Sequence, residues 1–519
     1  MTIMQVAEWA PDMPDLSEAT SIATGVIALT PQSYGPLNSL VPFSTNEIDN
    51  ECIGMGSGED TSLNDHIFAG TTDKLYHTPT GAIAWTDVSG STYAAANGEN
   101  WRFAQYNNLM IATDFDDPIQ SFNMLSGSTF AELSTDAPKA RHLAVAKTFL
   151  ITANTNDPVG GKNPARLWWS ASGDPTNFPT PGSTEAQQTQ SDYSDELGPQ
   201  GPIAGLSPNL AGCDCAVFFA RGVFRMIYVG PPDVFDFYPA AAVKGCPAPN
   251  SIAALESVVY YLAEDGFYAF DGNTSTPIGA NKVDKWFFAN VDQSHLELVI
   301  GAPDIANKAI IWIFKSIYTG NIRPDMMLLY RWDIQRWTMA PNIGQWISRI
   351  PVTESSGGSP PAVAPLVSGL IQLAAIHTQG ALGFFNGPLL PAQVGTKVVQ
   401  ITPNARSFVN RTRPLVNSAP PQALLTTESG TYIVTEAGNS PPGQILETES
   451  NSATITVAMS ARNTYQDVET FGPEVAPDIS GDCPQRSDGR YHRGRITVPI
   501  GAWTTMTGLD VSGIPAGLR

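Results

Sequence analysis

Carboxylates, histidines and cysteines are the residues of this 519-residue chain whose types and spacing could support chemistry. Asp114, Asp116 and Asp117 form one acidic cluster, and Glu264 and Asp265 form a second. Two carboxylates can hydrolyse a glycosidic bond when the fold sets them at the required separation. Adjacent acids in a turn are more often a solvated loop or a cation site, so we expect no catalysis from either cluster.

The six histidines and five cysteines lack the spacing of a metal site, and H-E-x-x-H is absent. The nucleophile motif G-x-S-x-G and the phosphate-binding G-x-x-x-x-G-K are absent too. Cys213 and Cys215 form a C-x-C in an alternating strand, which predicts that both thiols point to one face. Zinc needs further ligands nearby, so buried thiols are the expected state. We therefore predict no catalytic residue, no metal, no cofactor and no enzymatic activity.

The segment WWSASGDPTNF, from Trp168 to Phe178, loosely resembles the Asp-box turn of sialidase-like propellers. Ser170, Gly173 and Asp174 would form a tight turn between strands. In those enzymes the turn is structural and lies away from the active site, and here the order differs because Gly precedes Asp. The segment therefore favours a propeller only weakly and indicates nothing about catalysis.

A degenerate repeat organises the middle of the chain. Between residues 66 and 387, an apolar strand, a turn and a second strand rich in Tyr, Trp or Phe recur seven times. The second strands are marked by Leu75, Ile119, Leu167, Phe224, Phe267, Leu329 and Leu382, at separations of 44, 48, 57, 43, 62 and 53 residues. These separations bracket and slightly exceed the length of a four-stranded propeller blade.

A closed ring of stacked sheets suits this repeat, because one strand pair cannot bury both of its faces and a ring leaves no terminal face bare. Any large all-β chain yields some strand pairs at this spacing, which leaves a sandwich as the alternative. We predict an all-β fold with an irregular seven-bladed β-propeller, an extended N-terminal arm and a small C-terminal β domain.

Three regions differ in composition. Residues 1–45 are punctuated by proline, which leaves no room for a long helix and predicts an extended arm. Residues 46–400 hold the propeller units, with polar loop insertions at 154–202 and 351–366. Residues 401–519 contain nine Arg and no Lys, with alternating strands that predict a separate sandwich-like domain. One helix is expected over residues 282–299, capped by Asn281.

The charge balance is strongly acidic. The chain has 28 Lys plus Arg against 49 Asp plus Glu, a net charge of −21. A protein that grips nucleic acid by its phosphates needs clustered Lys and Arg, and the only tight cluster is Arg490, Arg493 and Arg495. The acidity therefore indicates either solubility or a surface that nucleic acid passes without sticking. No apolar run is long enough for a membrane span, and the N-terminus does not resemble a signal peptide.

Several stretches resemble tail proteins of short-tailed (podovirus-type) bacteriophages. The opening, Glu8 to Phe43, is similar in its W-x-P-D-x-P-D-L run and its Y-G-P-L segment. The units Tyr106 to Phe122 and Arg166 to Phe178, and the ending Arg486 to Val511, are similar to the same group. The resemblance implies a structural virion protein made in the host bacterial cytoplasm: a nozzle or hub in which propeller-bearing subunits form a hexameric ring below the portal and adaptor.

This resemblance implies a homo-oligomer that contacts the portal, the adaptor and other tail proteins, and through which double-stranded DNA passes without specific binding during genome ejection. An acidic, Lys-poor wall suits that role because it gives phosphates no site to settle on. A candidate subunit interface, able to pair with carboxylates of an adjacent subunit or tier, is formed by Arg406, Arg411, Arg413, Arg490, Arg493 and Arg495. Ordinary surface arginine is the competing interpretation.

A second class of function stays open: a receptor-binding or glycan-binding propeller, with or without glycan hydrolysis. Such a protein would show a pocket lined by aromatics and acids on one face and could work as a monomer or trimer. The tail-ring interpretation predicts stable rings and no turnover, so imaging of the purified protein separates the two.

Overall fold

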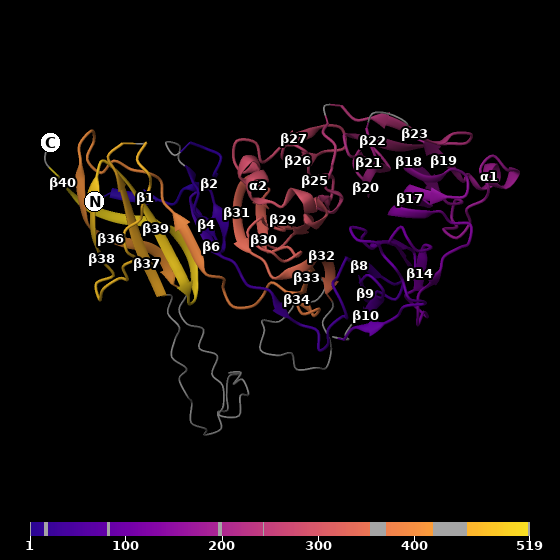
Figure 1. Ribbon diagram of the computed structural model, residues 1–519, viewed down its shortest axis with the longest axis horizontal. Helices are drawn as coiled ribbons and strands as arrows, with labels where there is room; N and C mark the ends of the chain where they lie inside the picture. Colours follow the sequence, from indigo (N-terminus) through magenta and orange to yellow (C-terminus); the bar gives the residue numbers. More distant parts are fainter. Residues whose placement is uncertain are drawn as a thin grey trace, which may run out of the picture. The chain divides into compact units, whose positions relative to one another are not determined.

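The computed structural model describes residues 2–14, 19–79, 84–195, 200–241, 243–352, 370–418, 454–464 and 466–516. Contacts divide the chain into two compact units. The propeller unit comprises Leu40–Gln335 and Pro341–Gly387, and the terminal unit comprises Met1–Ser39, Arg336–Ala340 and Pro388–Arg519. Strands dominate both units (Figure 1), and the chain is all-β as predicted.

Seven antiparallel sheets form the described part of the propeller unit, arranged around a common centre (Figure 1). Blades 1 to 3 are β8 (Gly54–Glu59), β9 (Asp65–Gly70), β10 (Leu75–Pro79) and β11 (Thr86–Asp87); β12 (Arg102–Tyr106), β13 (Leu109–Thr113), β14 (Gln120–Asn123) and β15 (Ala131–Glu132); and β16 (Lys139–Ala146), β17 (Phe149–Asp157), β18 (Gly161–Trp169) and β19 (Asp192–Asp195). Blades 4 and 5 are β20 (Ile203–Pro208), β21 (Cys215–Phe219), β22 (Gly222–Gly230) and β23 (Val234–Pro239); and β24 (Ala253–Leu255), β25 (Val258–Leu262), β26 (Phe267–Phe270) and β27 (Ser275–Pro277). Blade 6 contributes β28 (Ile300–Asp304), β29 (Ala309–Phe314) and β30 (Met326–Arg331), and blade 7 β32 (Gly344–Val352), β33 (Leu370–His377) and β34 (Leu382–Phe384).

The first strands of the blades form the inside of the ring. Strand β8 contacts β12, β12 contacts β16, and β16 contacts β20; further round, β24 contacts β28, β28 contacts β32, and β32 returns to β8. Blades 4 and 5 share one apolar core, in which Phe218 packs with Val259 and Tyr261. The sheets therefore close into a propeller.

A strand from the beginning of the unit completes the last blade. Strand β7 (Val41–Pro42) pairs antiparallel with β34, with Val41 opposite Phe384. The Phe43 ring meets the Phe384 ring edge-on, 5.2 Å between centroids. The seventh blade thus combines strands from the beginning and the end of the propeller unit. The pairing of β7 with β34 closes the ring and leaves β34 without an unpaired edge.

The predicted repeat corresponds to the two middle strands of each blade. Its pairs are β9–β10, β13–β14, β17–β18, β21–β22, β25–β26, β29–β30 and β33–β34. These strands carry the buried apolar and aromatic side chains, which is why their pattern was visible in the sequence. The prediction of a seven-bladed propeller is confirmed.

The first predicted loop insertion, 154–202, begins inside a blade rather than in a loop. Residues up to Asp157 belong to β17, and Gly161–Trp169 form β18. Polar residues lie in this sheet because they pair with one another: Arg166 is buried and its guanidinium reaches Asp157 at 2.9 Å and Asp195 at 2.6 Å. Only residues after Trp169, including α1 (Thr184–Thr189), connect the strands β18 and β19. Most of the second insertion, from residue 353, lies outside the described residues.

The helix expected over 282–299 is shorter and interrupted. Helix α2 spans Asp284–Asn290, and Val291 is extended and bridges Ser316. A 3₁₀ turn follows over Gln293–Leu298, capped by Asp292, whose side chain accepts from Ser294 N. Asn281 has φ 60° and does not cap α2, so the predicted cap is wrong. A second 3₁₀ turn, η1, spans Pro249–Ser251.

Two sheets form the terminal unit. The first has the order β38 (Cys483–Gly489), β36 (Ser407–Ser418), β40 (Trp503–Pro515), β6 (Ser33–Pro36) and β5 (Val26–Thr30), with β1 (Thr2–Gln5) also on β40. The second contains β31 (Arg336–Pro341), β4 (Ala23–Thr24), β35 (Ala392–Gly395), β39 (Tyr491–Ile500) and β37 (Thr454–Arg462). A separate short pair joins β2 (Glu8–Trp9) to β3 (Ala19–Thr20).

The two sheets of the terminal unit face each other. A Cβ placed on Gly494 of β39 would overlap Cδ1 of Leu509 on β40, so glycine allows the sheets to approach. Val457, Ile496 and Met506 are buried between them. The C-terminal β domain forms part of this unit, and strands from residues 2–36 belong to it as well. The predicted boundaries at 45 and 400 followed composition, whereas the contacts place residues 388–519 together with 1–39.

Candidate functional site

The six candidate interface arginines all lie in the terminal unit. Arg411 and Arg413, on β36, share one carboxylate: Arg411 Nη1 lies 3.0 Å from Asp482 Oδ2, and Arg413 Nε lies 2.9 Å from Asp482 Oδ1. Pairing of β36 with β38 brings these residues together. Their side chains remain 44% and 46% exposed, so both guanidinium groups can also reach a second partner.

Arg406 directly precedes β36, and Arg490 lies between β38 and β39. The two arginines bind different partners. Arg406 Nη2 lies 2.7 Å from Asp488 Oδ2, in a pair whose side chains are 41% and 44% exposed. Arg490 donates to the carbonyl oxygen of Asn404 at 2.8 Å. These two arginines are therefore also near the surface.

Arg493 does not fit the predicted surface role. Its side chain is 1% exposed, Nη1 lies 2.8 Å from Glu469 Oε2, and Nη2 donates to the carbonyl of Ala19 at 3.2 Å. Alternation along β39 places Arg493 on the face opposite Gly494, where Ala19 and Glu469 cover it. Burial of a guanidinium requires the carboxylate that Glu469 supplies. Arg493 is therefore buried within its own chain, and its place in a subunit interface stays a prediction.

Arg495 lies two residues further along β39 and is partly exposed. Its Nη2 is 3.0 Å from Glu474 Oε1, and its guanidinium lies over the Phe471 ring, 4.8 Å from the centroid. Five of the six arginines thus divide into an Asp482 group, an Asp488 group and a Glu469–Glu474 group, and Arg490 holds a backbone carbonyl. Each carboxylate that they hold belongs to the same chain, and pairing with another subunit stays a prediction.

The acidic cluster of Asp114, Asp116 and Asp117 forms a structural turn. In the turn between β13 and β14, Asp114 is buried and its Oδ1 accepts from Asp117 N at 3.0 Å. Asp116 and Asp117 accept from the backbone N–H groups of Ala96 and Ala94. Burial raises the pKa of Asp114 to about 7. Among the described residues, no group of three His, Cys, Asp or Glu side chains is arranged to hold a metal.

The cysteines are buried and unbridged, as expected for all five. The predicted shared face of Cys213 and Cys215 is wrong, because β21 begins only at Cys215. Cys213 packs with Phe218 on one side of the sheet, whereas Cys215 packs with Phe219 on the other. Burial raises the pKa of the Cys213 thiol to about 11.

The Asp-box-like segment forms a structural turn. Ser170 is buried and its Oγ accepts from Leu150 N at 3.1 Å. Gly173 has φ 82°, a left-handed conformation that glycine adopts without strain. Asp174 accepts from Thr176 N at 2.9 Å. All these contacts are internal to the turn and blade 3.

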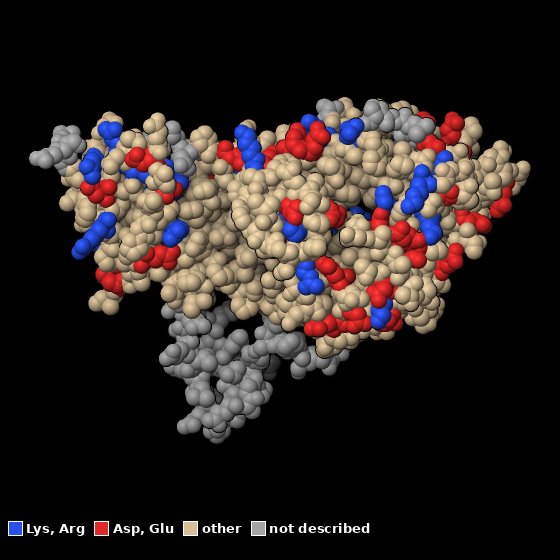
Figure 2. Space-filling view, viewed as in Figure 1, with Lys and Arg blue, Asp and Glu red and all other residues tan. Residues whose placement is uncertain are grey.

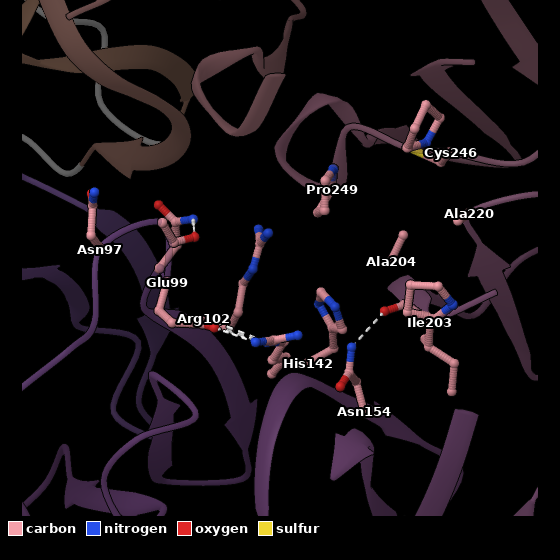
Figure 3. A pocket seen from close by; sticks show the side chains of 15 residues that line it. Asn97, Glu99, Arg102, His142, Asn154, Ile203, Ala204, Ala220, Cys246 and Pro249 are labelled. Carbon is pink, nitrogen blue, oxygen red and sulfur yellow. Dashed lines mark hydrogen bonds and ion pairs between the residues drawn. The ribbon is translucent and has the colours of Figure 1, made fainter. Parts of the chain in front are cut away.

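A pocket of about 320 Å³ lies where the first strands of blades 2, 3 and 4 begin. We call it the axial pocket, because β12, β16 and β20 are on the inside of the ring. The residues that line it include Glu99, Arg102, Arg141, His142, Asn154 and Cys246. Figure 3 shows Glu99, Arg102, His142, Asn154 and Cys246 around one cavity. Ligand pockets occupy about 300 to 1,000 Å³, so this one is at the small end of that range.

Arg102 opens β12 and points into the axial pocket. Its Nη2 donates to Asn250 Oδ1 in η1, and Asn250 Nδ2 in turn donates to the carbonyl of Glu297. Asn250 lies just before the first strand of blade 5. These hydrogen bonds therefore connect blade 2 with the segment that leads into blade 5. Burial lowers the pKa of Arg102 to about 10, and the group stays cationic at neutral pH.

Arg141 and Glu99 form a pair at the side of the pocket. Arg141 Nε lies 3.0 Å from both carboxylate oxygens of Glu99, and Nη2 also contacts Oε1. The Arg141 guanidinium stacks on the Phe115 ring, 4.4 Å from its centroid. The two charges are therefore matched to each other.

Backbone irregularities shape the opposite side of the pocket. Asn154 interrupts the pairing of β17 with β18 as a bulge, has φ 57°, and donates from Nδ2 to the Ile203 carbonyl at 3.1 Å (Figure 3). A second bulge lies at Ala204 in β20. Bulges often re-aim side chains beside binding sites. Sequence analysis missed this pocket because its residues come from separate blades and form no motif.

A buried histidine pair also escaped sequence analysis. His66 Nδ1 and His77 Nε2 lie 2.8 Å apart across strands β9 and β10, and His66 Nε2 lies 3.3 Å from Asp60 Oδ2. Eleven residues separate the histidines in sequence, and only the hairpin register brings them together. Burial lowers the pKa of His77 to about 4.

Comparisons with known proteins do not identify a family. No protein-family model matches the chain, and no curated protein matches it. Among solved structures, the computationally designed Ika8 protein is 10% identical over 67% of this chain and 98% of its own, with a TM-score of 0.33. Kluyveromyces lactis Hsv2p is 10% identical over 56% of this chain and 98% of its own, with a TM-score of 0.26. Scores this low support no argument, and the propeller assignment depends on the sheets themselves.

Proposed function

We propose that this chain is a structural subunit of a bacteriophage tail, forming a ring-shaped nozzle or hub below the portal and adaptor that conducts and gates genome exit. The proposal starts from the resemblance of two distant stretches, Glu8 to Phe43 and Arg486 to Val511, to tail proteins. Its main support is that both stretches contribute strands to the same folded unit: β5 and β6 from the first, and β39 and β40 from the second.

The residues that define the first stretch form its core. Trp9 is fully buried, and its backbone N–H donates to Tyr34 Oη at 3.1 Å. Tyr34 Oη in turn donates to the Ala7 carbonyl at 2.8 Å. Tyr34 also lies opposite Met506 of the second stretch. The similarity therefore involves residues that determine a fold, which is what a structural protein of an assembly would share with its relatives.

The distribution of charge is compatible with a conduit. Figure 2 shows a face covered largely by uncharged residues, with acidic side chains in several groups and fewer basic ones. Only 28 of the residues are Lys or Arg. Duplex DNA is held mainly by Lys and Arg on its phosphates, so such a surface offers few places to retain it.

Negative-stain imaging of the purified full-length chain tests the proposal. We expect closed rings of a single stoichiometry, six subunits, seen in end-on views, and mass photometry should give one matching mass. A population of monomers, or of open or trimeric particles without an axial opening at micromolar protein concentration, would reject the tail-ring function.

The arginine interface is tested separately by reversing two charges. Arg411→Glu with Arg413→Glu should place repelling charges beside Asp482 and beside any acidic partner, and rings should dissociate. The matched control reverses Arg221 and Arg349, exposed arginines of the propeller unit. Rings that persist in the Arg411/Arg413 variant, with unchanged circular dichroism, would refute this interface but not the ring.

A receptor-binding or glycan-binding role remains the second proposal. The specific observation in its favour is the axial pocket, which is concave and lined by charged and amide side chains. Carbohydrate arrays probed with the labelled protein would test it, and retention of any glycan above a denatured-protein control would support it.

A further inference from the structure

The charges of the axial pocket do not cancel. Arg141 holds both carboxylate oxygens of Glu99, at 3.0 Å from Nε. Arg102 donates a hydrogen bond to a neutral amide, that of Asn250, and the described residues provide it with no carboxylate at ion-pair distance. Glu99, Arg102 and Arg141 together therefore leave one positive charge, in a chain whose net charge is −21.

A fourth ionisable group of the pocket, beside Glu99, Arg102 and Arg141, is a neutral histidine. His142 lies next to Arg141 on β16 and is buried. Burial, followed by the nearby charges of Arg102 and Arg141, holds the pKa of His142 well below its usual range. His142 therefore adds hydrogen-bonding capacity to the pocket at neutral pH without adding charge.

The surroundings of Arg102 strengthen an interaction with an anion. One side of the pocket is apolar, formed by Pro202, Ile203 and Ala204, with Pro249 and Cys246 across the cavity (Figure 3). Low polarity around a guanidinium strengthens its attraction to an oxyanion. A guanidinium has five N–H donors in a planar fork, and Asn250 occupies one of them. The remaining donors suit a bidentate carboxylate or phosphate.

We propose that the axial pocket binds a small molecule of about monosaccharide size through a carboxylate or phosphate group that pairs with Arg102. Amide groups of Asn97 and Asn100 at the pocket supply hydrogen bonds for hydroxyls of the same ligand. This inference uses only the propeller unit and does not depend on the tail-ring function. It names a ligand chemistry for a pocket that the conduit role does not need.

Isothermal titration calorimetry on the full-length protein tests the proposal with four probes: glucuronate, glucose 6-phosphate, inorganic phosphate and neutral glucose. We expect saturable binding of at least one anionic probe and at least about tenfold weaker binding of glucose, because a charge-assisted pair is lost. Binding of glucuronate alone would identify a carboxylate site, and binding of either phosphate probe alone would identify a phosphate site.

Substitution of Arg102 completes the test. Arg102→Gln should weaken binding of the anionic probe at least about tenfold. Arg102→Lys keeps the charge but not the planar fork of donors, so its affinity should lie between those of the wild type and Arg102→Gln. The matched control is Arg331→Gln, a partly buried propeller arginine paired with Asp333 outside the pocket, which should bind as the wild type does. Thermal unfolding checks that each variant folds. The proposal is overturned when no anion binds the wild type, when glucose binds equally well, or when Arg102→Gln binds unchanged.

Discussion

Two buried ionisable side chains in neighbouring blades make the stability of the propeller depend on pH. His77 in blade 1 is packed against Phe68 and Phe122, with ring centroids 4.8 and 5.0 Å away. Asp114 directly follows β13, the second strand of blade 2, and its carboxylate oxygen Oδ2 has no hydrogen-bond partner among the described residues. Burial disfavours the charged form of both groups. The free energy of unfolding therefore falls with acid because of His77 and falls with base because of Asp114.

His77 should make the fold less stable in mild acid. Its pKa is about 4 in the folded chain, below the 6.5 of a free imidazole, so between these values only the unfolded chain takes up the proton. Stability from neutral His77 is complete above about pH 6.5 and is lost as pH falls towards 4. Urea unfolding at pH 7 and pH 5 should show that His77→Gln removes up to about 2 kcal/mol of this loss. His295→Gln is the control, and equal losses in both variants would contradict the prediction.

Asp114 should act in the opposite direction. Burial raises its pKa to about 7, above the 3.8 of the free group, so its favourable contribution is complete below about pH 4 and is lost as pH rises through 7. Asp114→Asn keeps an oxygen for Asp117 N–H and removes the buried charge. At pH 8.5 we expect the variant to be about 1–3 kcal/mol more stable than the wild type. The gain should be smaller at pH 5, where the folded carboxyl is still neutral, and should vanish below about pH 4. The exposed Asp136→Asn should show neither effect, and a destabilised Asp114→Asn at pH 8.5 would disprove the assignment.

At the scale of elements, the sequence predicts what local pattern determines. The middle strands of the blades were predictable because their apolar and aromatic side chains are buried, as Phe218 and Tyr261 are in blades 4 and 5. Outer strands such as β11 and β15 have two residues each and carry no pattern. Strand β7 was not predictable either, because its partner β34 lies more than 300 residues away and only ring closure joins them.

For the candidate sites, too, the sequence indicated residue types but not the positions that depend on distant contacts. Residue type marked Arg411, Arg413 and Arg493 alike as candidate interface cations. The exposure of the first two and the burial of Arg493 depend on which distant segments cover each position. The axial pocket could not be predicted, because Arg102 and Asn250 are 148 positions apart and meet only across the ring. A motif search finds residues that are neighbours in sequence, whereas a propeller brings together the starts of separate blades.

Closure by β7 predicts the effect of a single side chain. Phe43→Ala removes the ring that meets Phe384, and should destabilise the propeller unit by about 1–3 kcal/mol, because a half-buried aromatic loses part of its apolar contact. Limited proteolysis should then cut near residues 40–46 faster than in the wild type. Leu63→Ala, at a residue that is 71% exposed, serves as control. Unchanged proteolysis in Phe43→Ala would mean that β7 does not hold the seventh blade closed.

The close approach of the two sheets in the terminal unit gives a second test at this scale. Gly494→Ala places a methyl group onto Leu509, and the sheets must separate or Leu509 must change rotamer. We expect a loss of about 1–3 kcal/mol. Gly472→Ala is the control, because its Cβ would meet only the Met459 carbonyl oxygen at 3.5 Å. If Gly494→Ala melts like the wild type in differential scanning calorimetry, the two sheets do not form a packed sandwich at this point.

For the whole molecule, the proposed conduit and the proposed anion pocket make different demands on the same charge distribution. The net charge of −21 disfavours any extended polyanion. One excess positive charge in a cavity of about 320 Å³ can hold a single small oxyanion, which the cavity walls shield from the remaining acids. A duplex is too wide to enter such a cavity. The chain can therefore bind a small anion and still leave DNA free.

This difference predicts that the assembled protein does not retain duplex DNA. In electrophoretic mobility shifts with a random linear duplex, we expect no retardation at micromolar protein even at 50 mM salt, where a basic surface would bind most tightly because counterion release is strongest. The control is a basic DNA-binding protein of known salt dependence at the same concentration. Retardation that disappears between 50 and 200 mM salt would indicate phosphate contacts by clustered Lys or Arg, and the conduit proposal would then fail. Addition of an anion that fills the axial pocket should leave the result unchanged, because the pocket contributes no surface that a duplex can reach.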